Sequence, residues 1–258
     1  MPRLAANLST LFPELDFLDR FDAAARAGFR YVEYQFPYGR DHRVVATRAR
    51  AAGVEVVLHN IPAGDFARGE RGIACLPDRV VDFRSGVERA IDYAQAVGCT
   101  RLNCLPGIAP AGVSRERLFD SLAGNVHYAA DRLKAAGIRL MLEPCNRRSV
   151  PGFFVATSAE AIAVLDAAGS DNAFLQYDLF HMQIMEGDLA KTIERLLPRI
   201  GHMQLADVPD RHEPGTGEIN FPWLLAQIDR LGYTGAIGCE YNPRGDTVAG
   251  LAWAKPYL

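Results

Sequence analysis

The chain has 258 residues, a formal net charge of −3 at pH 7, 49% hydrophobic residues and 23% charged residues. Charges of both signs are mixed along it, so no basic stripe is available for nucleic acid, and no apolar run approaches the roughly 20 residues of a membrane span. A single α/β barrel commonly has about this length and needs neither a disulfide nor a structural metal for stability.

The cysteines indicate a reducing environment. They form no C-x-x-C pair, and their odd number leaves one unmatched; they are Cys75, Cys99, Cys104, Cys145 and Cys239. Most lie in apolar runs, so we expect buried free thiols. The first residues, Met1–Asn7, lead directly into a strand without the apolar core of a signal peptide. We therefore expect a cytoplasmic protein.

A repeated pattern of amphipathic helix, glycine and short apolar strand runs through the chain. The punctuating glycines are Gly28, Gly53, Gly98, Gly137, Gly201 and Gly232, with Gly169 less regular. Glycine just after a helix is a common C-cap, because it adopts the left-handed conformation without a Cβ clash. The pattern predicts eight strands, at Leu4–Leu8, Tyr31–Gln35, Val54–His59, Arg101–Leu105, Ile138–Glu143, Phe174–Asp178, His202–Leu205 and Ala236–Glu240.

The helices between these strands follow a 3.6-residue period. In Val80–Val97 the apolar residues form one stripe that we expect to face the sheet. Thr157 and Glu160 form a capping box, which predicts a helix start at which each side chain accepts a hydrogen bond from the other residue's backbone N–H. Eight alternating strand–helix units without a polar linker predict one domain over residues 1–258, a closed (β/α)8 TIM barrel.

Side-chain alternation along the strands separates the barrel interior from the exterior. If Glu143 points inward, Met141 and Arg139 do so too, and the same parity applies to the strands that end at Asp178 and Glu240. Two βα connections are long, and long βα loops lie over the catalytic face of a barrel, often as lids. They span residues 60–78 and 206–222.

Motifs for nucleotide binding and for serine hydrolysis are not supported. No G-x-G-x-x-G follows the first strand, which disfavours a dinucleotide-binding fold. Gly215–Glu218 lacks the strand–loop–helix spacing of a Walker phosphate loop. A Ser-His-Asp triad is likewise unsupported, because the chain has no G-x-S-x-G.

Four consecutive strands carry oxygen-bearing side chains at or near their ends: Glu143, Asp178, Gln204 and Glu240. The carboxyl ends of parallel strands in a closed barrel meet at one mouth, where three carboxylates would repel one another. A hard divalent metal such as Mg²⁺ or Mn²⁺, bound through oxygen ligands, resolves that repulsion. The alternative is that each acid is an ordinary strand-end residue paired with a nearby Lys or Arg, which explains one such acid better than it explains the whole group.

Basic side chains near the strand ends are candidates for substrate binding. His181 could hydrogen-bond a substrate oxygen. His59, which ends the third predicted strand, is an equal candidate for that role. A structural role is the alternative for both. Arg211 could hold a substrate carboxylate by a bidentate contact. Arg71 and Arg244 compete for that role, and a solvated surface arginine is the alternative for all three.

With these residues in view, the sequence resembles the hydroxypyruvate isomerases, which are members of the xylose-isomerase-like TIM-barrel superfamily. The likeness spans essentially the whole chain, and the joint pattern is highly specific. The segments that carry it are Ala5–Ser9, Phe36–Tyr38, Leu58–Asp65, Gly69–Pro77, Gln176–Gln183, Asp210–Asn220 and Gly238–Tyr241.

The resemblance implies that Glu143 and Glu240 are the proton donor and acceptor. It also implies a metal site made by Glu143, Asp178, Gln204 and Glu240, with Gln204 where many superfamily members carry His. One departure is Asn242, since the family commonly has Lys after the Glu-Tyr pair. The related 2-oxo-tetronate isomerases share the four strand-end residues, so these residues do not separate the two substrates. The loop after the third strand is more similar to the hydroxypyruvate branch.

The implied activity is the interconversion of hydroxypyruvate and tartronate semialdehyde through a cis-enediol(ate), within glyoxylate metabolism. Its partner is a small hydroxy-oxo acid, and homo-oligomerisation is left open. A ketose 3-epimerase is a rival that would retain the carbonyl position in its product. A DNA-repair nuclease is disfavoured, since His-rich metal ligands and a positive groove are missing. A catalytically silent sugar-acid-binding barrel would bind its ligand without isomerising it.

Overall fold

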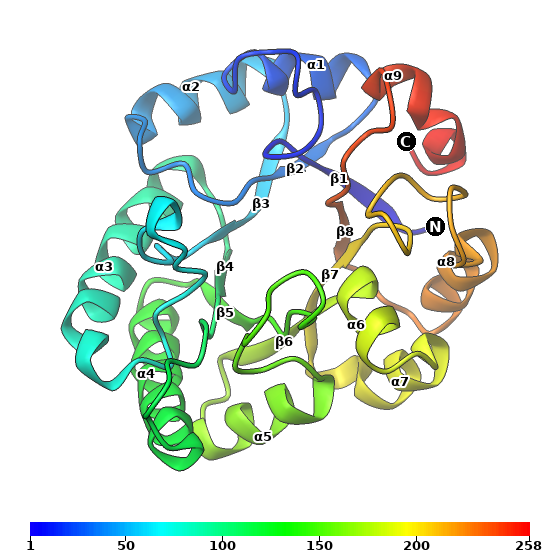
Figure 1. The fold of residues 1–258 in the computed structure, drawn as a ribbon. Helices are drawn as coiled ribbons and strands as arrows, with labels where there is room; N and C mark the ends of the chain where they lie inside the picture. The colour runs from blue at the N-terminus through cyan, green and yellow to red at the C-terminus, as the bar shows by residue number, and fades with distance from the viewer.

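The chain folds as a closed barrel of eight parallel strands with helices packed around the outside (Figure 1). The computed structural model describes residues 1–258. Strand order around the barrel follows chain order, and the eighth strand pairs with the first to close the ring. The predicted (β/α)8 architecture is therefore confirmed.

Every predicted strand is present, with ends within two residues of the predicted ones. The strands are β1 (Arg3–Asn7), β2 (Tyr31–Glu33), β3 (Glu55–Asn60), β4 (Arg101–Cys104), β5 (Arg139–Leu142), β6 (Ala173–Asp178), β7 (Ile200–Leu205) and β8 (Ala236–Cys239). The α-helices are α1 (Arg20–Arg26), α2 (His42–Ala52), α3 (Val80–Val97), α4 (Arg115–Ala135), α5 (Ser158–Ala168), α6 (Leu179–Met185), α7 (Leu189–Leu196), α8 (Phe221–Arg230) and α9 (Thr247–Gly250). Short 3₁₀ helices cover Phe66–Arg68, Pro77–Arg79, Leu197–Arg199 and Leu251–Tyr257.

The helix ends follow the sequence signals, with one difference. Helices α2, α3 and α5 end at glycines in the left-handed conformation, namely Gly53, Gly98 and Gly169. At the start of α5 the Thr157 side chain accepts a hydrogen bond from the Glu160 N–H at 3.1 Å, as predicted. The Glu160 carboxylate, however, accepts from the N–H of Ala156 at 2.7 Å instead of that of Thr157. Helix α5 therefore starts as predicted. The backbone N–H that donates to Glu160 belongs to Ala156, one residue before the predicted Thr157.

Apolar side chains fill the barrel interior toward the amino ends of the strands. Ala5, Val57, Leu58, Met141 and Ala236 form one buried cluster, with Phe174 packed against it; we call these six residues the interior plug. The inward direction predicted for Met141 is confirmed. Gly201 makes room for the plug, since a Cβ at this position would lie 2.5 Å from the Met141 sulfur and 2.7 Å from the Phe174 Cβ.

A continuous core of 66 buried residues lies outside the sheet, chiefly between the strands and the helices. Helix α3 buries the predicted stripe against this core through Phe83, Val87, Ala90, Ile91 and Ala94. All five cysteines are buried and free, as predicted. None of the helices combines the length and the apolar character that a membrane crossing requires.

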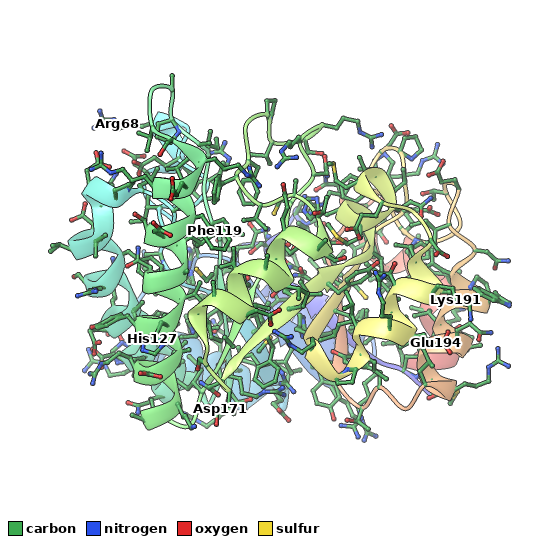
Figure 2. All side chains as sticks on the ribbon, turned by 90° about the horizontal axis from the view of Figure 1, so that it is seen from below. Arg68, Phe119, His127, Asp171, Lys191 and Glu194 are labelled. Atoms are coloured by element: carbon green, nitrogen blue, oxygen red, sulfur yellow. The ribbon has the colours of Figure 1, made fainter.

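The connections at the carboxyl ends of the strands surround the mouth of the barrel. In the side view of Figure 2, Arg68 marks this end and Asp171 the opposite end. The long loops predicted after β3 and β7 are present, and a third long connection, residues 143–157, joins β5 to α5. The sequence analysis does not predict this third loop. It supplies part of the cavity described next.

Candidate active site

The four predicted strand-end residues meet at the carboxyl end of the barrel. Glu143, Asp178, Gln204 and Glu240 are each at most 6% exposed. A cavity of about 180 Å³ opens above them, and both glutamates line it. Its other lining residues are Gln35, Phe36, Asn60, Phe66, Arg71, Leu105, Cys145, Val150, Phe153, His181 and Arg211. A small pocket with convergent polar groups is the usual form of an active site.

Glu240 is held by four hydrogen-bond donors. Its Oε1 accepts from Arg211 Nη2 at 2.5 Å and from Gln35 Nε2 at 3.0 Å. Its Oε2 accepts from Gln204 Nε2 at 2.6 Å and from Asn7 Nδ2 at 3.2 Å. Only the first two donors line the cavity, so Oε1 is the oxygen on the cavity side. Burial raises the pKa of Glu240 to about 7, and the guanidinium of Arg211 opposes the rise.

Glu143 has fewer partners. Its Oε2 accepts from Asn103 Nδ2 at 2.6 Å, while its Oε1 lies 3.9 Å from His181 Nε2 and accepts no hydrogen bond within the chain. Burial raises the pKa of Glu143 well above its ordinary value, and the charges of two neighbouring carboxylates add to the rise. Glu240 has an arginine bound to it and Glu143 has none. Carboxyl groups in such different environments can act as acid and base in one site.

Asp178 uses one carboxylate oxygen and leaves the other without a hydrogen bond. Its Oδ1 accepts from the N–H of Phe180 at 2.8 Å and caps α6. Its Oδ2 is buried without a hydrogen-bond partner, with His181 Nε2 and Arg211 Nη2 each 3.5 Å away. A buried polar atom without a partner destabilises the fold. A cation bound at this position would give the oxygen its partner.

The hydrogen bonds of His181 define its tautomer. The backbone N–H of Asn146 donates to His181 Nδ1 at 3.2 Å. Because a backbone N–H can only donate, Nδ1 is the acceptor and the hydrogen of the neutral ring is on Nε2. Burial, and then the charge of Arg211, lower the pKa of His181 well below its ordinary value, so the ring is neutral. The Nε2–H faces Glu143 and Asp178, where it can donate to a substrate oxygen.

One group of side chains has its ligand atoms gathered as in a metal site, and a second group has the ligand chemistry that suits a hard metal ion. Glu143, Cys145 and His181 offer ligand atoms within 4.8 Å of one another. This group suits a metal poorly, because burial raises the pKa of the Cys145 thiol well above its ordinary value and His181 presents an N–H. The carboxylates of Glu143, Asp178 and Glu240 are the hard oxygen donors that Mg²⁺ and Mn²⁺ prefer. The unpartnered Oδ2 of Asp178 agrees with the second group.

The amide of Gln204 turns its nitrogen, and not its oxygen, toward the carboxylates. Its Nε2 donates to Glu240 Oε2 at 2.6 Å and to Glu33 Oε1 at 2.7 Å. Its Oε1 accepts from Gln176 Nε2 at 2.6 Å. In this orientation Gln204 is a hydrogen-bond donor to Glu240. For Gln204 to be the metal ligand predicted from the sequence, its amide would have to rotate so that Oε1 and not Nε2 faces the carboxylates.

A further carboxylate lies under the cavity and is missed by the sequence analysis. Glu33, on β2, is completely buried. It accepts hydrogen bonds from Asn7 Nδ2 at 2.9 Å and Gln204 Nε2 at 2.7 Å, and its Oε2 lies 2.7 Å from His202 Nε2. Asn7 and Gln204 donate to Glu240 as well, so both amides bridge the two carboxylates. Glu33 is therefore part of the framework that holds Glu240.

Two sequence signals could have identified Glu33. It is a carboxylate inside an apolar strand, and it shares the parity of Gln35, which reaches the cavity. Gly238 occupies an inward position on β8, which is separated from β2 only by β1. A Cβ at Gly238 would lie 2.2 Å from Glu33 Oε1, so only glycine leaves the space that Glu33 fills.

His59, a predicted candidate for substrate binding, lies away from the cavity. His59 does not line the cavity, and its ring is buried among Tyr34, Tyr38 and Tyr93. Adjacent side chains of a strand point to opposite faces, so the inward direction of Asn60, the last residue of β3, turns His59 outward. Burial lowers the pKa of His59 to about 4, as expected for a ring packed between aromatic side chains.

The three candidate arginines differ in whether they line the cavity. Arg71 and Arg211 line the cavity, whereas Arg244 does not. Arg211 has a left-handed backbone (φ 60°), and its carbonyl accepts from the N–H of Asn242 at 2.8 Å. The side chain of Arg211 is engaged by Glu240 Oε1, so its predicted contact with a substrate carboxylate would require it to leave that partner.

The glycine-rich segment 215–218 is not a phosphate loop. The Asp207 carboxylate accepts hydrogen bonds from the N–H groups of Gly215, Thr216 and Gly217, at 2.9 to 3.1 Å. Its other oxygen accepts from Val208 and Ile219. The backbone donors of this loop are thus already occupied by an internal anion, which agrees with the weak sequence signal.

Comparison with known proteins places these residues in a family context. The family model described as xylose isomerase-like TIM barrel matches residues 21–257. Hydroxypyruvate isomerase of Escherichia coli K12 is 48% identical, with 100% of both chains covered. A 2-oxo-tetronate isomerase of Cupriavidus necator is 46% identical, covering 100% of this chain and 99% of its own.

Solved structures agree with the family match. A crystal structure from Brucella melitensis, described as an AP endonuclease of family 2, is 46% identical and superposes with a TM-score of 0.97 over 100% of this chain and 99% of that chain. A structure of L-ribulose 3-epimerase is 25% identical, with a TM-score of 0.77 over 99% of this chain and 86% of that one. The sequence and the fold thus point to the same group of barrels.

Proposed function

The chain belongs to the xylose isomerase-like TIM-barrel family, and on that premise we propose that it is an isomerase that interconverts hydroxypyruvate and tartronate semialdehyde. The observation that carries the proposal is that Glu143 and Glu240, which directly follow β5 and β8, line one cavity. A volume of about 180 Å³ suits a small hydroxy-oxo acid. The five free cysteines agree with a cytoplasmic location.

In the proposed reaction the two carboxyl groups move a proton between adjacent carbons. Glu240, beside Arg211, is the ionised group and removes a proton from the hydroxymethyl carbon at its cavity-side Oε1, from which the substrate displaces Gln35. The electron pair forms a cis-enediolate. Glu143 then delivers a proton to the neighbouring carbon, while the hydroxyl hydrogen passes to the former carbonyl oxygen. His181 Nε2–H stabilises the developing oxyanion.

A divalent metal, Mg²⁺ or Mn²⁺, is part of the proposal. Glu143, Asp178 and Glu240 would hold it, with Gln204 as a further oxygen ligand once its amide turns over. When bound, the ion supplies positive charge next to the enediolate oxygens. Arg211 contacts two of the same carboxylates, so guanidinium and metal compete for them.

The test is a product assay on purified protein with hydroxypyruvate and with 2-oxo-tetronate, each with and without chelator. We expect Glu143→Gln and Glu240→Gln to lower turnover about 10²–10⁴-fold, the usual contribution of a general acid or base. Glu116→Gln is the matched control, since Glu116 is exposed on α4. Near-normal activity in both cavity variants would refute the assigned roles.

The same assay separates the other candidates. Turnover of 2-oxo-tetronate in preference to hydroxypyruvate would select the second activity, which the 46% identity to the Cupriavidus necator protein favours. A product that keeps its carbonyl position would select a ketose 3-epimerase, which the likeness to L-ribulose 3-epimerase favours. Saturable binding without turnover would indicate a sugar-acid-binding barrel.

A further inference from the structure

The charges around the cavity leave one cation without an anionic partner. Arg211 is bound to Glu240 Oε1 at 2.5 Å and lies 3.5 Å from Asp178 Oδ2. Arg71, on the loop after β3, lines the same cavity and forms no ion pair. The adjacent Glu70 does not neutralise it, because the Glu70 carboxylate pairs with Arg79. An unpaired guanidinium facing a cavity is suited to bind an anion.

The guanidinium of Arg71 is held on one side and free on the other. Its Nη1 donates to the backbone carbonyls of Phe66 at 3.2 Å and Glu70 at 2.7 Å. Its plane lies over the Phe66 ring, 4.4 Å from the ring centre, and Phe66 packs on Phe36 at 4.7 Å. The Nε and Nη2 groups donate to no atom of the chain. Two donors of the planar fork therefore remain for a ligand.

The backbone on both sides of Arg71 is fixed. The Glu70 carboxylate accepts from the N–H of Asp65 at 2.6 Å. Gly72 has φ 111° and pairs with Pro106, and a Cβ there would lie 2.3 Å from the Leu105 carbonyl oxygen. A cation on a fixed backbone loses little freedom when its ligand binds. The loop therefore holds the backbone of Arg71 in one position beside the cavity.

We propose that Arg71 binds the carboxylate of the substrate and so selects short 2-oxo and 2-hydroxy acids over uncharged sugars. This inference rests on the proposed function, since it names the substrate group that the same cavity takes. A carboxylate anchored at Arg71 directs the neighbouring carbons toward Glu143 and Glu240, which line the other parts of the cavity. Arg211 then remains with the catalytic carboxylates.

The test compares Arg71→Met and Arg71→Lys with Arg68→Met. Arg68 is an exposed arginine of the same loop whose side chain makes no hydrogen bond (Figure 2). We expect Arg71→Met to raise KM for hydroxypyruvate about 10–100-fold, as for a lost charge-assisted hydrogen bond. The kcat should change only a few-fold, Arg71→Lys should recover part of the loss, and Arg68→Met should behave as wild type.

A binding measurement keeps this result separate from the isomerase activity. Tartronate, a dicarboxylate of the same length, is titrated by calorimetry into each protein, with Mg²⁺ and with chelator. We expect Arg71→Met to weaken tartronate binding about 10–100-fold in both conditions. If wild type binds tartronate through Arg71 but does not isomerise hydroxypyruvate, the proposed function fails and the anion site stands. A wild type that does not bind tartronate, or an Arg71→Met variant that binds it equally well, overturns the assignment.

Discussion

Replacing Gly238 with alanine tests the polar framework under the cavity. A Cβ at this position would lie 2.2 Å from Oε1, 2.4 Å from Oε2 and 2.4 Å from Cδ of Glu33, so the Glu33 side chain must move. It is completely buried and cannot move into solvent. Movement would break its hydrogen bonds with Asn7, Gln204 or His202.

The expected cost follows from these contacts. Overpacking a well-filled interior costs about 1–3 kcal/mol, and losing one hydrogen bond to a charged group costs about 1.5–3 kcal/mol. We therefore expect Gly238→Ala to lower the free energy of unfolding by about 3–5 kcal/mol. The kcat should fall too, because Asn7 and Gln204 also hold Glu240.

Urea unfolding followed by circular dichroism measures the loss. The matched control is Gly124→Ala on α4, where the added methyl group has open space and should stabilise the helix by up to about 1 kcal/mol. A double-mutant cycle identifies the cause: with Glu33→Ala in place, Gly238→Ala should cost less than about 1 kcal/mol. An equal cost with and without the Glu33 side chain would show that the clash is not responsible.

Four other outcomes follow from the site. Glu143→Gln should melt no lower than wild type at pH 8 in chelator, because burial raises the pKa of Glu143 and the charged form destabilises the fold; a lower melting temperature would contradict this. The pKa of Glu240 is about 7 against an ordinary 4.5, so the folded state binds more protons and metal-free stability should fall by about 3 kcal/mol as pH rises from 4.5 through 7. Urea unfolding across that range should show the fall, and Glu240→Gln should flatten the curve. Asp178→Asn should weaken Mn²⁺ binding at least about tenfold in a calorimetric titration; unchanged affinity would remove Asp178 from the metal site. Asp207→Ala leaves backbone donors unpaired and should cost about 1–3 kcal/mol, with faster protease cleavage in 207–219 as the readout.

Most of the fold could be predicted from the sequence because its signals are local. The strands contain short apolar runs, helix α3 has an apolar stripe, and α3 and α5 end at capping glycines. These features depend on residues close together in the chain, so reading one segment at a time recovers them. The convergence of Glu143, Asp178, Gln204 and Glu240 followed from one further step, since parallel strands in a barrel end at the same mouth.

The rest of the site depends on contacts between distant segments. The partners of Glu33 lie on two other strands, β1 and β7, and the space it fills is set by Gly238 on β8. Its strand also shifts register against β3 between Val32 and Glu33, which a pattern within one segment cannot indicate. The position of His59 has a simpler cause. Adjacent side chains on a strand point to opposite faces, so taking His59 and not Asn60 as the last residue of β3 selects a side chain that points away from the cavity.

The interior plug has a consequence for how the reaction exchanges with water. Because Met141 and Phe174 fill the amino half of the barrel around Gly201, molecules enter and leave only past the loops at the carboxyl end. Substrate and product then share one route, and a hydrogen lifted from carbon stays on a buried carboxyl group while that route is occupied. Because Glu143 supplies the hydrogen that the neighbouring carbon receives, deuterium that Glu240 removes from the hydroxymethyl carbon should exchange with solvent and not appear on the neighbouring carbon of the product.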